Sequence, residues 1–302
     1  MKKLSLISIC AQLLIGILFY SVTTGVASAA SCSANYVASS NDGGKCTFTP
    51  EQLKVSVYKF GLCQVKPTYL DYSGCVFFRD STEAADITVS VGQKIALTGN
   101  ATLEIGTYTH LVQLWDSSVS FKFTHIPFAT DQYGADGIAG EFCYSNGNVK
   151  PADPTKPSLR NVTCADSPKS AIFSTQNISP LGPVSPHNAM TNVASPSGFF
   201  DAQLLSDPKT LAAITFTPVG PDMVMSSNAK YLFTVLTMTN ALKITESTSS
   251  ISVEVLLEDA FTQESYFGAP DQYCNGGSGN SNAKYCLGNA ELTSLGFTIT
   301  AQ

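Results

Sequence analysis

Charged side chains are scarce in this chain of 302 residues. Only 13% of the residues are Asp, Glu, Lys or Arg, whereas globular domains usually contain about 25%. Arginine occurs only at Arg79 and Arg160, and the formal net charge at pH 7 is −6. Nucleic-acid binding requires clusters of Lys and Arg against the phosphate backbone. The composition therefore excludes nucleic acid as a partner.

The sequence also lacks the short motifs of common enzyme classes. It contains no G-x-S-x-G elbow, no H-E-x-x-H, no P-loop and no dinucleotide-binding glycine pattern. Its three histidines are His110, His125 and His187, and a Ser or Cys hydrolase needs one of them beside a nucleophile and an orienting acid. We predict no catalytic residue. A secreted hydrolase stays open, because paired carboxylates meet only in the folded chain.

Metal-binding patterns are missing as well. No C-x-x-C pair occurs and histidines are few, which argues against zinc. In the Asp131–Gly137 segment, Tyr133 and Ala135 occupy two of the alternate positions that a calcium loop fills with oxygen ligands. We therefore predict no metal site and no cofactor.

The N-terminal residues show the pattern of a signal peptide. Lys2 and Lys3 precede an almost wholly apolar run from Leu4 to Tyr20, and Ala27-Ser28-Ala29 matches the site that a signal peptidase cuts. We predict a signal peptide over residues 1–29, with an uncleaved membrane anchor as the alternative. Cleavage leaves 15 basic against 23 acidic residues, a charge of −8. No second apolar run of that length follows, so we predict no membrane span after cleavage.

Eight cysteines remain in the mature region. An even number of cysteines in an exported chain is typical of a disulfide framework. Short loops close most readily, so we predict pairing between neighbours in the sequence, although eight cysteines allow 105 connectivities. The expected pairs are Cys32–Cys46, Cys63–Cys75, Cys143–Cys164 and Cys274–Cys286.

Alternation of apolar and polar residues dominates the mature region. Leu53, Val55 and Val57 alternate with polar or amphipathic side chains, and similar segments lie at 87–91, 106–115, 119–124, 231–238, 251–256 and 296–300. Such segments, separated by Gly, Asn and Pro, are typical of antiparallel strands. We predict an all-β fold, an antiparallel β-sandwich whose long loops are held by disulfides. Only Asp201–Leu205 and Pro208–Ala213 are candidates for a helical turn.

Eight of the 15 prolines lie between Lys150 and Gly198. A long stretch without secondary structure is unusual inside a compact domain, so it is either a linker or a surface excursion. A Cys143–Cys164 disulfide would tie its first part to the preceding strand. We therefore predict a single domain over residues 30–302, with a proline-rich surface excursion at about 146–200.

Three aromatic residues are the candidate ligand contacts. Trp115 is the only tryptophan and ends the predicted strand 106–115, where it would stack on a sugar ring if it faced solvent, or pack in the core. Tyr69 and Tyr72 lie in the loop between Cys63 and Cys75, together with Phe77 and Phe78 just after it. They would either form an exposed adhesive patch or fix that loop to the core.

The segment Leu103-Glu104-Ile105-Gly106-Thr107-Tyr108-Thr109 resembles the start of a strand in bacterial surface β-sandwiches of the transthyretin-like type. With the opening strand Leu53–Phe60, the likeness covers about the first third of the mature chain. It implies a stalk or adhesin, and in the Cna-B relatives a Lys–Asn isopeptide cross-link. Here Gln113 stands where those relatives tend to have an acid, and Phe297–Gln302 lacks the asparagine, so the resemblance does not extend to the cross-link.

We therefore predict a secreted, non-enzymatic structural or adhesive protein of the bacterial surface or periplasm. A carbohydrate or small-ligand binding module and a secreted hydrolase of unknown specificity are the alternatives. The expected partners are further copies of the chain, surface polymers or other proteins. The expected location is periplasmic, cell-surface or extracellular.

Overall fold

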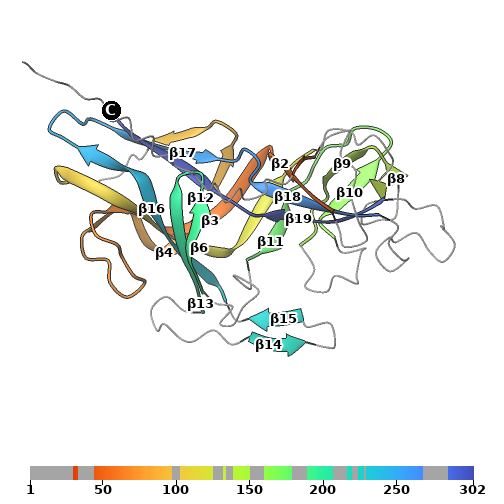
Figure 1. The fold of residues 1–302 in the computed structure, drawn as a ribbon, viewed down its shortest axis with the longest axis horizontal. Helices are drawn as coiled ribbons and strands as arrows, with labels where there is room; N and C mark the ends of the chain where they lie inside the picture. Colours follow the sequence, from red (N-terminus) through yellow and green to blue (C-terminus); the bar gives the residue numbers. More distant parts are fainter. Residues whose placement is uncertain are drawn as a thin grey trace, which may run out of the picture.

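A computed structural model describes residues 30–32, 44–96, 103–124, 132–133, 139–149, 160–178, 189–206, 216–219, 224–227, 229–267 and 285–302. The predicted signal peptide, His125, His187, Pro208–Ala213 and Cys274 lie outside these residues. Every regular element in the described part is a β-strand (Figure 1), which confirms the predicted all-β class. None of the described residues forms a helix long and apolar enough to cross a membrane.

One large antiparallel sheet organises the molecule. Its strand order is β12 (Ala189–Ser195), β13 (Gly198–Leu205), β16 (Tyr231–Ile244), β6 (Gly106–Lys122), β3 (Gln52–Cys63) and β4 (Cys75–Ser90). A seventh strand, β11 (Ser174–Asn177), pairs with β6 over Ser118–Phe121, beyond the stretch of β6 that pairs with β16. We call these seven strands the main sheet.

The side chains of the main sheet alternate between two faces. In β3, Leu53, Val55 and Val57 are buried, while the intervening Lys54 and Ser56 are half-exposed. Val119 and Phe121 of β6 and Phe123 just beyond it are fully buried. Successive residues of a strand point to opposite faces, so the predicted alternation defines an inner face that carries the main core.

A second layer covers the inner face. The strands β20 (Gly296–Ala301), β17 (Ile251–Leu256) and β5 (Lys94–Ala96) form a three-stranded antiparallel sheet. Its side chains Ile251, Val253 and Phe297 belong to the same buried cluster as Val55 and Leu111 of the main sheet. This two-layer packing is the predicted sandwich.

The second layer continues toward the other end of the molecule. The chain of β17 passes through residues 257–260 into β18 (Phe261–Phe267), and β19 (Tyr285–Leu292), paired with β18, leads back into β20. Figure 1 shows β18 and β19 beside β2 (Gly44–Phe48), β9 (Phe142–Ser145) and β10 (Val162–Ala165), at the end opposite β4 and β16. The shorter strands are β1 (Ala30–Ser31), β7 (Gln132–Tyr133), β8 (Ala139–Gly140), β14 (Phe216–Val219) and β15 (Val224–Ser227).

Phenylalanine rings fill the core at the β18 end. Phe48 lies 4.6 Å from Phe123 between ring centroids, and Phe121 lies 4.6 Å from Phe261. All four side chains are buried. Rings at these separations pack closely, so the layers are well filled at this end.

Three of the four predicted disulfides are confirmed: Cys32–Cys46, Cys63–Cys75 and Cys143–Cys164. The last two join directly paired residues of neighbouring strands, β3 with β4 and β9 with β10. Disulfides of this kind indicate an oxidising, non-cytosolic compartment. The Cys274–Cys286 pair stays a prediction, because Cys274 lies outside the described residues.

Three local predictions are wrong. Asp201–Leu205 is not a helical turn but part of β13, because all eight β13 residues pair with β16. The strand predicted to end at Trp115 continues to Lys122, because β11 pairs with β6 beyond the residues that pair with β16. The excursion at 146–200 contains β10, β11, β12 and the start of β13 in its described parts, and its described Pro196 lies in the turn between β12 and β13, outside the ladder.

Candidate functional site

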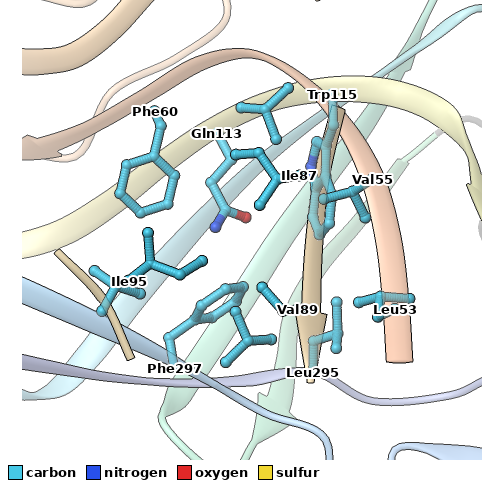
Figure 2. A pocket seen from close by; sticks show the side chains of 13 residues that line it. Leu53, Val55, Phe60, Ile87, Val89, Ile95, Gln113, Trp115, Leu295 and Phe297 are labelled. Carbon is cyan, nitrogen blue, oxygen red and sulfur yellow. The ribbon is translucent and has the colours of Figure 1, made fainter. Parts of the chain in front are cut away.

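A partly open cavity of about 80 Å³ lies between the two layers, under β3, β4 and β6. All but one of its lining side chains are apolar: Leu53, Val55, Val57, Phe60, Ile87, Val89, Ile95, Trp115, Val253, Val255, Leu295 and Phe297. Figure 2 shows these side chains converging on one space from both layers. The remaining lining residue is Gln113 of β6.

The side chains on either side of the cavity explain why the layers leave space there. Five valines, three from the main sheet and two from β17, line it beside the rings of Phe60, Trp115 and Phe297, whereas at the β18 end phenylalanine rings pack directly against one another. Sheets in a sandwich are held about 10 Å apart, and two facing valines span less of that distance than two facing rings. The pairing of β3 with β6 also shifts register on both sides of Val57, which displaces neighbouring side chains.

Gln113 brings an amide into this apolar surface. It is only 5% exposed and stands on the inner face of β6, between Leu111 and Trp115. Its Oε1 accepts a hydrogen bond of 3.0 Å from Thr234 Oγ1 on the neighbouring strand β16. The Thr234 hydroxyl in turn accepts a bond of 3.2 Å from Trp115 Nε1. Three buried polar groups therefore form one chain that ends at the Gln113 amide.

Trp115, a predicted ligand contact, lies at this cavity. Its side chain is 6% exposed and belongs to the inner core, so it faces away from bulk solvent. Its indole N–H is occupied by Thr234, and its ring forms part of the cavity wall. Trp115 is therefore packed in the core, which is one of the two expectations from the sequence, and it also lines an internal cavity.

Tyr69 and Tyr72, the other two predicted contacts, lie on the opposite face of the main sheet. The ring of Tyr72 is 5.5 Å from Phe77 and 6.1 Å from Phe233, and that of Tyr69 is 6.2 Å from Phe233. They cover a smaller buried cluster on that face, which includes Val112 and the disulfide partner Cys63. We call it the outer cluster. The structure therefore does not bring Tyr69 and Tyr72 together with Trp115.

Burial has an electrostatic consequence at Tyr72. Removal of the phenol from water disfavours its ionised form, and the negative charge of Asp80 adds to this effect. Together they raise the pKa of Tyr72 to about 12. Lys59 Nζ lies 5.6 Å from the Tyr72 ring centroid, over the ring. Tyr72 thus serves as part of the cover over the outer cluster.

His110 also lies on the outer face, beside the disulfide, since it pairs with Cys63. Burial lowers the pKa of the His110 imidazole, and the positive charge of Lys66 lowers it further, while Asp201 opposes both. Lys66 and Asp201 form an ion pair, and Thr109 Oγ1 lies 2.8 Å from His110 Nδ1. Across the described ranges, no group of three or more His, Cys, Asp or Glu residues is arranged to hold a metal ion.

Sequence reasoning missed the role of Gln113 and Thr234. Gln113 is the one strongly polar residue in the apolar run Leu111-Val112-Gln113-Leu114-Trp115, and all five are buried. An amide inside such a run is a signal of a buried polar site. Thr234 gave no such signal, because only the pairing of β16 with β6 places it opposite Gln113.

Comparisons of this chain with protein-family models, with curated proteins and with solved structures find no match. The cavity geometry and its chemistry are therefore the basis for a functional proposal.

Proposed function

We propose that this protein is an exported binding protein for a small, largely apolar ligand held between its two sheets. The observation that carries the proposal is the partly open, almost wholly apolar cavity at Gln113 and Trp115. The small-ligand alternative from the sequence is thereby preferred over a hydrolase.

The cavity is large for a protein interior. A buried water needs only about 10–15 Å³ of such volume, and interiors contain few voids larger than a water molecule. At about 24 cal/mol per Å³ of empty volume, a cavity of about 80 Å³ left empty costs about 2 kcal/mol of folding free energy. A ligand that fills it would recover that stability.

The volume limits how much of a ligand the cavity encloses. An engineered apolar cavity of about 150 Å³ takes up benzene, and this one is about half that size. Such a space encloses only part of a molecule larger than benzene, such as 2-hexanone. Because the cavity is partly open, the far end of the ligand can extend toward solvent.

The disulfides agree with a binding role outside the cytosol. All three are formed and lie away from the cavity lining. The structural or adhesive role predicted from composition stays a prediction, because no feature within the described ranges selects a polymer or a partner protein for it.

Trp115 provides a direct assay, since it is the only tryptophan and it lines the cavity. We expect 2-hexanone to change the emission of Trp115 in a saturable way. Val253→Phe, which fills the cavity from β17, should abolish the saturable change.

The matched control is Val149→Phe, the same substitution at a residue that is 50% exposed and does not line the cavity. Its titration should equal that of the unmodified protein. A strictly linear response in every variant, or equal saturation in Val253→Phe, would contradict the proposal.

A further inference from the structure

The orientation of the Gln113 amide is set by its neighbours. The Thr234 hydroxyl has one hydrogen, and it donates this hydrogen to Gln113 Oε1 while it accepts from Trp115 Nε1. If the amide were flipped, the Thr234 hydroxyl would accept from both Trp115 Nε1 and Gln113 Nε2, and its own hydrogen would have no acceptor among the described residues. The amide oxygen is therefore held at Thr234, and the amide nitrogen is directed away from it.

The amide nitrogen is left without a partner. Gln113 Nε2 makes no hydrogen bond to any residue in the described part of the chain, although the side chain is 95% buried. Figure 2 shows this nitrogen pointing into the space between Phe60, Ile95 and Phe297. The nitrogen is not among the fully buried side-chain atoms that lack a partner, so it reaches the cavity surface, and an unpaired donor there indicates what the cavity receives.

The chemistry of the lining narrows the class of ligand. A donor with two free hydrogens requires an acceptor on the ligand, which a pure hydrocarbon lacks. No Lys, Arg, Asp, Glu or His lines the cavity, so a carboxylate or an ammonium group would be buried without a counter-charge. An alcohol would also bring a hydroxyl hydrogen, for which the lining offers only the second lone pair of an amide oxygen that Thr234 already uses, whereas a carbonyl group brings no such hydrogen.

We propose that the ligand is an uncharged aliphatic carbonyl compound, a ketone, aldehyde or ester, whose carbonyl oxygen accepts a hydrogen bond from Gln113 Nε2. This inference rests on the proposed function, and it adds the residue that selects the ligand and the functional group that is selected. Gln113 is the specificity-determining residue, and the valine walls bind the carbon chain.

The experiment compares three probes of similar length: 2-hexanone, n-hexane and hexanoate. Their affinities are measured by methyl NMR shifts of the unmodified protein and of Gln113→Leu, which keeps the bulk of the side chain but removes the amide. We expect 2-hexanone to bind the unmodified protein about tenfold more tightly than n-hexane, and hexanoate to bind most weakly. In Gln113→Leu the preference for the ketone should disappear, while n-hexane still binds.

A second measurement needs no variant. The side-chain NH₂ resonances of Gln113 should shift with 2-hexanone and stay in place with n-hexane. Equal affinities of the two probes for the unmodified protein, or unchanged NH₂ resonances at saturating ketone, would overturn the inference and leave the proposed function standing. Failure of both neutral probes to bind would instead overturn the proposed function and this inference with it.

Discussion

Gln113 and Trp115, which line the cavity, form a buried chain of side-chain hydrogen bonds with Thr234. Each bond fixes the next, because the indole can only donate and the hydroxyl has a single hydrogen. In an apolar interior such a chain is costly to break, since its members have no water to replace a lost partner. The position of the Gln113 amide therefore depends on Thr234.

Thr234→Val tests this dependence at nearly constant volume. It leaves Gln113 Oε1 and Trp115 Nε1 without the hydroxyl that joins them. We expect the free energy of unfolding, measured by urea denaturation, to fall by about 1–3 kcal/mol. Thr237→Val on the same strand is the matched control, because Thr237 is half-buried on the outer face, and it should change stability by less than about 0.5 kcal/mol. Equal losses in the two variants would argue against the chain.

Tyr72 predicts a pH dependence on the outer face. Its folded pKa of about 12 lies above the ordinary value of 10.0, so the unfolded chain loses this proton first. The contribution of Tyr72 to stability is complete below pH 10 and is lost as the pH rises from 10 through 12. Tyr72→Phe should therefore show a shallower decline of unfolding free energy in that range. Identical declines in both proteins would contradict this assignment.

At the scale of elements, alternation predicted the long strands well and the short polar strands poorly. Strand β3 was predictable from Leu53, Val55 and Val57, because its inner face is apolar and its outer face is mixed. β11 has the sequence Ser-Thr-Gln-Asn and β12 exposes most of its side chains, so neither carries an apolar stripe. They are strands because β6 and β13 offer them a ladder of backbone hydrogen bonds. That pairing arises only in the folded chain.

The same reason limited the prediction of the site. Trp115 was selected as the only tryptophan, and it does line the cavity, but the cavity itself depends on valines that approach each other from β3, β4 and β17. Nothing in the local sequence of β17 shows which residues of the main sheet it will face. Tyr69 and Tyr72 were selected as an aromatic group near a disulfide, and packing against Phe233 places them on the outer face.

The Cys63–Cys75 disulfide closes the loop that covers the outer cluster. Replacement of both cysteines by alanine should lower the free energy of unfolding by about 3 kcal/mol, because the unfolded chain gains freedom. Release of the loop should also return the pKa of Tyr72 toward 10.0, as measured by ultraviolet titration. Binding of 2-hexanone should be unchanged, since the cavity lies on the other face.

The corresponding variant of Cys143 and Cys164 is the control for that experiment. It removes a disulfide that joins β9 to β10, away from the outer cluster. It should cost a comparable amount of stability while the titration of Tyr72 stays as in the unmodified protein. A shift of the Tyr72 titration in this control, or none in the Cys63–Cys75 variant, would show that the loop is held by other contacts.

At the scale of the whole molecule, the two ends of the sandwich are filled differently. Phenylalanine rings pack directly against one another at the β18 end, whereas the valines, Gln113 and the rings of Phe60, Trp115 and Phe297 border a partly open space at the other. In the second layer, the pair β17–β20 lies at the open end and the pair β18–β19 lies at the filled end. The filled end supplies a closely packed core, and the open end holds the cavity that we propose as the binding site.

Contacts between the ligand and the cavity wall test most directly whether a small ligand enters this space. Nuclear Overhauser effects from the methyl protons of bound 2-hexanone should reach the methyl groups of Val55 on β3 and Val253 on β17, which belong to opposite layers. The exposed Val149 should show none. Saturable effects at Val55 and Val253 together are the predicted result, and their absence at saturating ketone, or effects confined to exposed side chains such as Val149, would contradict the account.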